Sequence, residues 1–126
     1  MENIEYRNKA ECEFCACGET RTICSNEVCA KKIIIRIETI ESKRCVFTGD
    51  RLDYTIKICN DSLVDIDDPL FSDDLPEGLK YVKDSFRVNN KPETPILCPY
   101  GNKISYKLHK IKANSEVIIK FETIVL

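Results

Sequence analysis

Apolar and polar residues alternate in several short segments of the chain, and this pattern predicts β strands. The clearest case is residues 52–59, LDYTIKIC, where the even-numbered positions are apolar: Leu52, Tyr54, Ile56 and Ile58. The odd-numbered positions, which end at Cys59, fall on the opposite face. A period of two residues is typical of a strand that buries one face, so we expect Cys59 to point outward.

Two further segments alternate in the same way. Residues 104–109 place Ile104, Tyr106 and Leu108 inward, and residues 116–126 place Val117, Ile119 and Phe121 inward. Residues 33–40 and 85–88 are β-branched or aromatic runs that also favour strands. No segment has a helical apolar stripe. Short strands separated by turn residues predict an all-β fold, an antiparallel β sandwich. We expect one core that contains Tyr54, Ile56, Ile58, Leu79, Phe86, Tyr106 and Phe121.

The N-terminal residues differ from this pattern, because they hold many cysteines and few large apolar side chains. Five cysteines lie there: Cys12, Cys15, Cys17, Cys24 and Cys29. The sequence therefore predicts two parts, an extended cysteine-rich N-terminal arm (residues 1–31) and the sandwich (residues 32–126). The remaining cysteines, Cys45, Cys59 and Cys98, are spread through the sandwich.

Composition narrows the classes of partner. The chain has 126 residues, a net charge of −2 and 32% charged residues of both signs. This gives no basic stripe for nucleic acid, and no apolar run is long enough to span a membrane. The N-terminus lacks the apolar core of a signal peptide, so we expect synthesis in the cytoplasm. Cytosolic thiols are normally reduced, so the high cysteine content needs an explanation. Three are open: the cysteines bind metal, they are oxidised after the protein leaves the cell, or Met1 has replaced a signal peptide.

Two kinds of chemistry suit the cysteines. Cys12, Cys15, Cys24 and Cys29 supply four thiolates, the number that a tetrahedral zinc ion takes. The first alternative is crosslinking by any of the eight cysteines, and the second is a disordered tail with free thiols. Five in the arm and three in the sandwich are odd counts, so complete pairing needs a bond between arm and sandwich or between chains. We expect Cys59 to be accessible to an arm cysteine.

Catalysis and calcium binding have little support. The single histidine, His109, falls on an outward face, and no nucleophile and base can be paired. The acidic segment 65–74 lacks the spacing of an EF-hand. We therefore expect no enzyme activity and no cofactor.

Two sequence blocks carry a family resemblance. GDRLDYTIKICNDS (residues 49–62) and DDLPEGLKYVKDS (residues 73–85) resemble the bacterial surface repeat of the domain-of-unknown-function eleven family. The chain departs from it at Asn114, where the family usually has glycine, and at Cys59 and Cys98. The resemblance implies an immunoglobulin-like sandwich that acts as a structural spacer on cell surfaces, without catalysis.

The repeat is also similar to domains of fibres on bacterial endospores, whose appendage subunits carry cysteine-bearing N-terminal connectors. A spore protein meets oxidising surroundings only after the mother cell lyses. This implies a self-assembling fibre subunit whose partners are copies of itself and an anchor protein at the spore or cell surface. The arm would lie along an exposed sheet edge of the next subunit. The alternatives are a zinc-binding adaptor and a surface-adhesion module.

Overall fold

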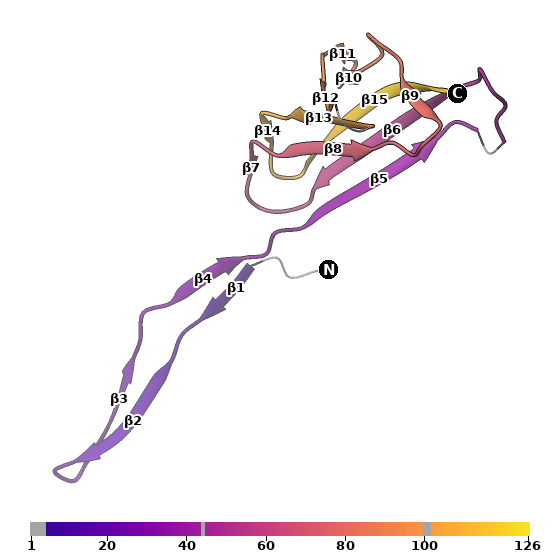
Figure 1. The fold of residues 1–126 in the computed structure, drawn as a ribbon. Coiled ribbons are helices and arrows are strands. Elements are labelled where there is room, and N and C mark those ends of the chain that lie inside the picture. The colour runs from indigo at the N-terminus through magenta and orange to yellow at the C-terminus, as the bar shows by residue number, and fades with distance from the viewer. Residues whose placement is uncertain (1–4, 44, 100–101) are drawn as a thin grey trace.

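The computed structural model describes residues 5–43, 45–99 and 102–126, and these residues form an all-β protein (Figure 1). Fifteen strands and no helix lie in the described residues, so they contain no helix long and apolar enough to cross a membrane. All strand pairs are antiparallel. The fold class expected from the alternation is therefore confirmed at the level of an all-β protein.

The largest sheet has six strands in the order β11-β10-β15-β6-β5, with β9 also paired to β15. Its strands are β5 (Ile35–Glu41), β6 (Arg51–Asn60), β9 (Leu79–Tyr81), β10 (Arg87–Val88), β11 (Lys91–Pro92) and β15 (Ser115–Val125). A three-stranded sheet follows the order β12-β13-β8, with β8 (Leu70–Asp74), β12 (Ile96–Leu97) and β13 (Lys103–Lys107). A short pair joins β7 (Ile66–Asp67) to β14 (Lys110–Ile111).

The predicted strand parity is confirmed at the centre of the large sheet. Ile56 is paired with Ile119, and Tyr54 with Phe121, so the inward positions of β6 and β15 lie side by side. The Tyr54 and Phe121 rings stack with their centroids 5.3 Å apart. Cross-strand pairs of this kind stabilise a sheet through side-chain contact. The run at residues 85–88 is shorter than expected as a strand, since only Arg87–Val88 pairs.

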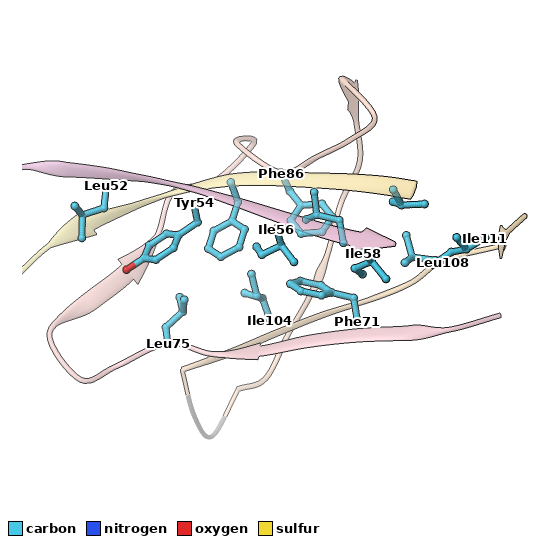
Figure 2. Close-up of a cluster of buried hydrophobic side chains, with 13 residues drawn as sticks. Leu52, Tyr54, Ile56, Ile58, Phe71, Leu75, Phe86, Ile104, Leu108 and Ile111 are labelled. Atoms are coloured by element: carbon cyan, nitrogen blue, oxygen red, sulfur yellow. The ribbon is translucent and has the colours of Figure 1, made fainter. Parts of the chain in front are cut away.

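The core lies between the large sheet and the three-stranded sheet (Figure 2). Of the seven side chains expected there, five are buried, and Leu79 and Tyr106 are partly buried against them. The other buried apolar side chains are Leu52, Phe71, Leu75, Ile104, Leu108, Ile111, Val117 and Ile119. Phe86 is fully buried between the two sheets, with Phe71, Tyr106 and Phe121 as ring neighbours. Burial of this apolar surface is the main force that holds the sheets together.

Three turns require particular residues that the alternation of apolar and polar positions does not predict. Gly78 has φ +94°, and the Leu79 N–H donates to the Pro76 carbonyl oxygen at 3.2 Å, so the Leu-Pro-Glu-Gly segment forms a tight turn into β9. Asn89 and Asn90 both have positive φ in the two-residue turn between β10 and β11. Asn114 has φ +56°. Asparagine tolerates this left-handed conformation, which accounts for Asn114 where the resembled family has glycine.

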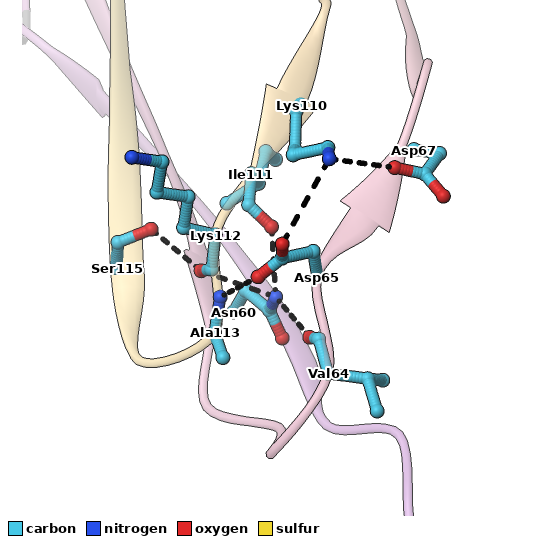
Figure 3. A network of polar contacts seen from close by, with 9 residues as sticks. All are labelled: Asn60, Val64, Asp65, Asp67, Lys110, Ile111, Lys112, Ala113 and Ser115. Carbon is cyan, nitrogen blue, oxygen red and sulfur yellow. Dashed lines mark hydrogen bonds and ion pairs between the residues drawn. The ribbon is translucent and has the colours of Figure 1, made fainter.

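Asn60 ties the end of β6 to two neighbouring loops (Figure 3). Its side chain is fully buried, and its amide group donates to the carbonyl oxygens of Val64, Ile111 and Lys112 at 2.9, 3.0 and 3.2 Å. Its Oδ1 atom accepts the Ser62 N–H at 3.0 Å. The side chain thus joins the end of β6 to the segment before β7 and to the end of β14 through backbone groups.

The first strands form a separate two-stranded structure, which we call the N-terminal ribbon (residues 5–31). It contains β1 (Glu5–Asn8) paired with β4 (Val28–Lys31), and β2 (Glu11–Ala16) paired with β3 (Glu19–Cys24). Figure 1 shows the ribbon projecting away from the other sheets. The remainder of the described chain is called the body below. Residues 1–4 of the expected arm lie outside the described residues.

Candidate functional site

The N-terminal ribbon is exposed on both faces. Within the described residues its strands pair only with one another, and every residue of β2 and β3 is exposed. Its large apolar side chains, Tyr6, Phe14, Ile23 and Val28, are between 42 and 60% exposed. A two-stranded hairpin without an apolar face to bury is marginally stable in water. The ribbon is therefore a segment that would gain stability from a second surface.

The tip of the ribbon is a two-residue turn between β2 and β3, formed by Cys17 and Gly18, which both have positive φ (52° and 78°). Ala16 and Glu19 on either side are paired, so this is the tight hairpin turn that matches strand twist. Alternation does not predict these strands, because neither face is apolar. The signal that could have found them is Cys17-Gly18 between two runs of possible strand residues.

The four proposed zinc ligands do not converge. In the register of β2 and β3, Cys12 faces Ile23 while Cys24 faces Glu11, so Cys12 and Cys24 lie on opposite faces. Cys15 shares the face of Cys24, and Cys29 lies in β4, nearer the body. Among the described residues, no group of three or more His, Cys, Asp or Glu side chains could hold a metal ion.

Cys29 and Cys24 both donate their thiol to a carboxylate, and the Cys29 contact is the shorter one, since Cys24 Sγ lies 3.8 Å from Glu11 Oε1. Cys29 Sγ donates to Glu5 Oε1 at 2.8 Å, and Arg7 also bonds this carboxylate at 3.1 Å. The hydrogen bond to Glu5 raises the pKa of the Cys29 thiol, and loss of solvent raises it further. Because the thiolate is the reactive form, this hydrogen bond lowers the reactivity of Cys29.

Cys59 lies on the predicted face, yet the expectation that it is accessible is wrong. It points away from the core, but only 9% of it is exposed. Its paired neighbours are Arg36 in β5 and Glu116 in β15, and the Glu116 Oε2 atom accepts from the thiol at 3.6 Å. Burial raises the pKa of Cys59, and the bond to Glu116 adds to this. Long side chains from adjacent strands thus cover an outward-facing thiol.

Cys45 and Cys98 are the exposed cysteines of the body. Cys45 lies between Glu41, where β5 ends, and Arg51, where β6 begins. Cys98 follows β12, and its N–H donates to the Lys103 carbonyl oxygen at 3.0 Å. With the five ribbon cysteines, seven of the eight cysteines are exposed, and all eight lie in the described residues as free thiols.

The body also has an open sheet edge. β5 and β8 are each the last strand of their sheet and pair with one neighbour among the described strands. Four isoleucines in or next to β5 are exposed: Ile33, Ile35, Ile37 and Ile40. An exposed apolar edge strand is a template for pairing with another chain, and Arg36 and Glu38 on this strand are the charges that limit non-specific pairing.

A groove of about 310 Å³ opens between the two edges. Its walls include Ile37 and Glu41 from β5 and Phe71 and Asp73 from β8. Burial raises the pKa of Asp73, and the neighbouring Asp74 carboxylate raises it further. The groove is therefore apolar at its floor and acidic at its rim.

His109 and the acidic segment 65–74 remain from the residues named in the sequence. His109 is exposed. In the acidic segment, Asp65 Oδ1 accepts the Ala113 N–H at 2.8 Å, and Lys110 Nζ lies 3.9 Å from Asp65 and 3.6 Å from Asp67 (Figure 3). These carboxylates hold the β7–β14 pair to the segments next to it.

Comparison of the chain with protein-family models, with curated proteins and with solved structures found no match.

Proposed function

We propose that the protein is a structural subunit that assembles head to tail into a disulfide-linked fibre, with the N-terminal ribbon as its connector. The observation that carries this proposal is the ribbon itself: its paired strands have exposed apolar side chains and five cysteines, and within the described residues they pair with no strand of the body. A segment of this kind is stabilised when it docks on a neighbour. In this proposal the body is an immunoglobulin-like sandwich that acts as a spacer.

The contact would join two different surfaces, the ribbon of one copy and the body of the next. Such a heterologous contact makes an open filament when its rotation does not close into a ring. The body offers exposed apolar surface for such a contact, because β5 is the last strand of its sheet and four isoleucines in or next to it are exposed. Disulfides would then make the joint permanent.

Oxidising surroundings are required for such a joint. We propose synthesis in the reducing cytoplasm and oxidation at the spore surface or outside the cell, where an anchor protein would hold the end of the fibre. The resemblance to bacterial surface and spore-fibre domains supports this location, and the seven exposed thiols are compatible with it.

The test is assembly of the full chain under controlled redox conditions. Reduced protein is oxidised with a mixture of reduced and oxidised glutathione, then analysed by non-reducing gel and negative-stain imaging. We expect a ladder of linked species and filaments that survive denaturant and fall apart when reductant is added as well. A product that stays monomeric, or that stops at a closed dimer, would overturn the proposal.

A further inference from the structure

The body has two ends, and the ribbon is attached to one of them. Ile35, the first residue of β5, is paired with Asn60, the last residue of β6. The Ile34 N–H donates to Ser62 Oγ at 2.7 Å, and the Ile34 carbonyl oxygen accepts the Asp61 N–H at 2.9 Å. These bonds fix the point where the ribbon meets the body. We call this the ribbon end and the opposite one the distal end (Figure 1).

Cys45 lies at the distal end. β5 runs the length of the sheet from Ile35 to Glu41, and Glu41 is paired with Tyr54 near the start of β6. The chain then turns through Cys45 and returns at Arg51, which is paired with Ile124 near the end of β15. Cys45 is therefore separated from the ribbon by the full length of β5.

Cys98 lies at the distal end of the other sheet. It is held beside Lys103, and Lys103 is paired with Asp74, the last residue of β8. From there a short turn leads to Leu79, which is paired with Val125 at the end of β15. Asn102 connects the two layers, because its amide group donates to the Leu79 carbonyl oxygen at 2.6 Å. Both exposed body cysteines thus lie at the end opposite the ribbon.

We propose that Cys45 and Cys98 are the acceptor cysteines for the β2–β3 hairpin of the next copy, which supplies Cys12, Cys15, Cys17 and Cys24 as donors. This inference rests on the proposed fibre and names the two surfaces that meet in it. Cys29 is excluded as a donor because it lies in β4 at the base of the ribbon and not in the hairpin, and Cys59 is excluded as an acceptor because it is covered.

Reach favours a bond between chains over one within a chain. From Glu5 to Cys17 the ribbon has 13 residues, which span about 43 Å at about 3.3 Å per residue. It extends away from the distal end (Figure 1), so its tip is separated from its own acceptors by the ribbon and the body together. The distal end of another copy meets the tip without any bending.

The chemistry is thiol–disulfide exchange with a small-molecule disulfide as oxidant. A hairpin thiolate attacks one sulfur of the oxidant, forms a mixed disulfide and releases one small thiol. A Cys45 or Cys98 thiolate of the neighbour then attacks the hairpin sulfur of that mixed disulfide and releases the second small thiol. Two protein thiols are oxidised to one disulfide and one oxidant molecule is reduced to two thiols, which carry the two protons.

Two full-length variants test this assignment. The acceptor variant carries Cys45→Ser and Cys98→Ser, and the donor variant carries Cys12→Ser, Cys15→Ser, Cys17→Ser and Cys24→Ser. The matched control carries Cys29→Ser and Cys59→Ser. With the glutathione mixture as oxidant, we expect the control to form the same ladder as the unmodified chain. Each of the other two variants should form at least tenfold less linked protein, and an equimolar mixture of them should give a linked dimer that grows no further.

Peptide mapping identifies the bonds directly. Cleavage after Lys and Arg gives peptide 10–21, which holds Cys12, Cys15 and Cys17, and peptide 45–51, which holds Cys45. We expect reducible links from 10–21, or from Cys24 in peptide 22–31, to 45–51 or to 88–103, which holds Cys98. A Cys45–Cys98 bond within one chain, or links between two ribbons, would overturn the assignment. Filaments formed by the acceptor variant would overturn it and leave the fibre standing, whereas an unmodified chain without linked species would overturn both.

Discussion

The N-terminal ribbon and the β6–β15 pair are both antiparallel, yet they differ in what stabilises them. In β6 and β15 one face of each strand is buried, and the paired inward positions fill the core. In β2 and β3 no residue is buried. Burial of one large apolar side chain contributes about 1.5–3 kcal/mol to stability. The body therefore has the buried surface to fold alone, and the ribbon does not. Strand pairing by itself does not make a stable structure.

The largest effect on the body is expected from Ile56→Ala. Ile56 is 1% exposed, and removal of a large aliphatic group from a packed core costs about 2–5 kcal/mol. Denaturant unfolding of the reduced protein measures this loss in the free energy of unfolding. The matched control is Ile37→Ala in β5, where 65% of the side chain is exposed and the change should stay within about 0.5 kcal/mol. Equal losses at both positions would contradict the assigned core.

A smaller loss is expected from Asn60→Ala. The change leaves the buried carbonyl oxygen of Ile111 without its side-chain donor, and an unsatisfied buried group costs about 1–3 kcal/mol. Asn26→Ala in the ribbon is the control, because Asn26 is exposed. Thermal unfolding of the two variants compares a polar residue of the body with one of the ribbon. An unchanged unfolding midpoint for Asn60→Ala would show that these hydrogen bonds do not stabilise the body.

Asn114→Ala should lower the free energy of unfolding by about 1 kcal/mol. Asn114 has φ +56°, and an alanine there takes on the left-handed strain of about 1–2 kcal/mol, part of which asparagine already carries. Asn114→Gly removes that strain and should unfold at the same temperature as the unmodified chain or higher. If alanine and glycine behave alike in thermal unfolding, the turn does not have the conformation described.

The body of the fold could be predicted from sequence because burial imposes a period of two. Ile56, Ile104 and Ile119 follow from that period, whereas the buried side-chain hydrogen bonds of Asn60 do not. The ribbon strands could not be found in this way, since both faces are exposed and no apolar period exists. The cover over Cys59 depends on Arg36 and Glu116, which only the strand register brings beside it. The shared position of Cys45 and Cys98 likewise depends on strand order across two sheets.

The smallest effect on body stability is expected from removal of the ribbon, and this change tests the central claim most directly. A chain of residues 31–126 keeps β5 to β15 and the whole core, so its denaturant midpoint should match that of the reduced full chain. Under the oxidising glutathione mixture it should stay monomeric by size-exclusion chromatography, while the full chain forms filaments in negative stain. Filaments that form equally well from residues 31–126 would show that the body drives assembly and would contradict the account.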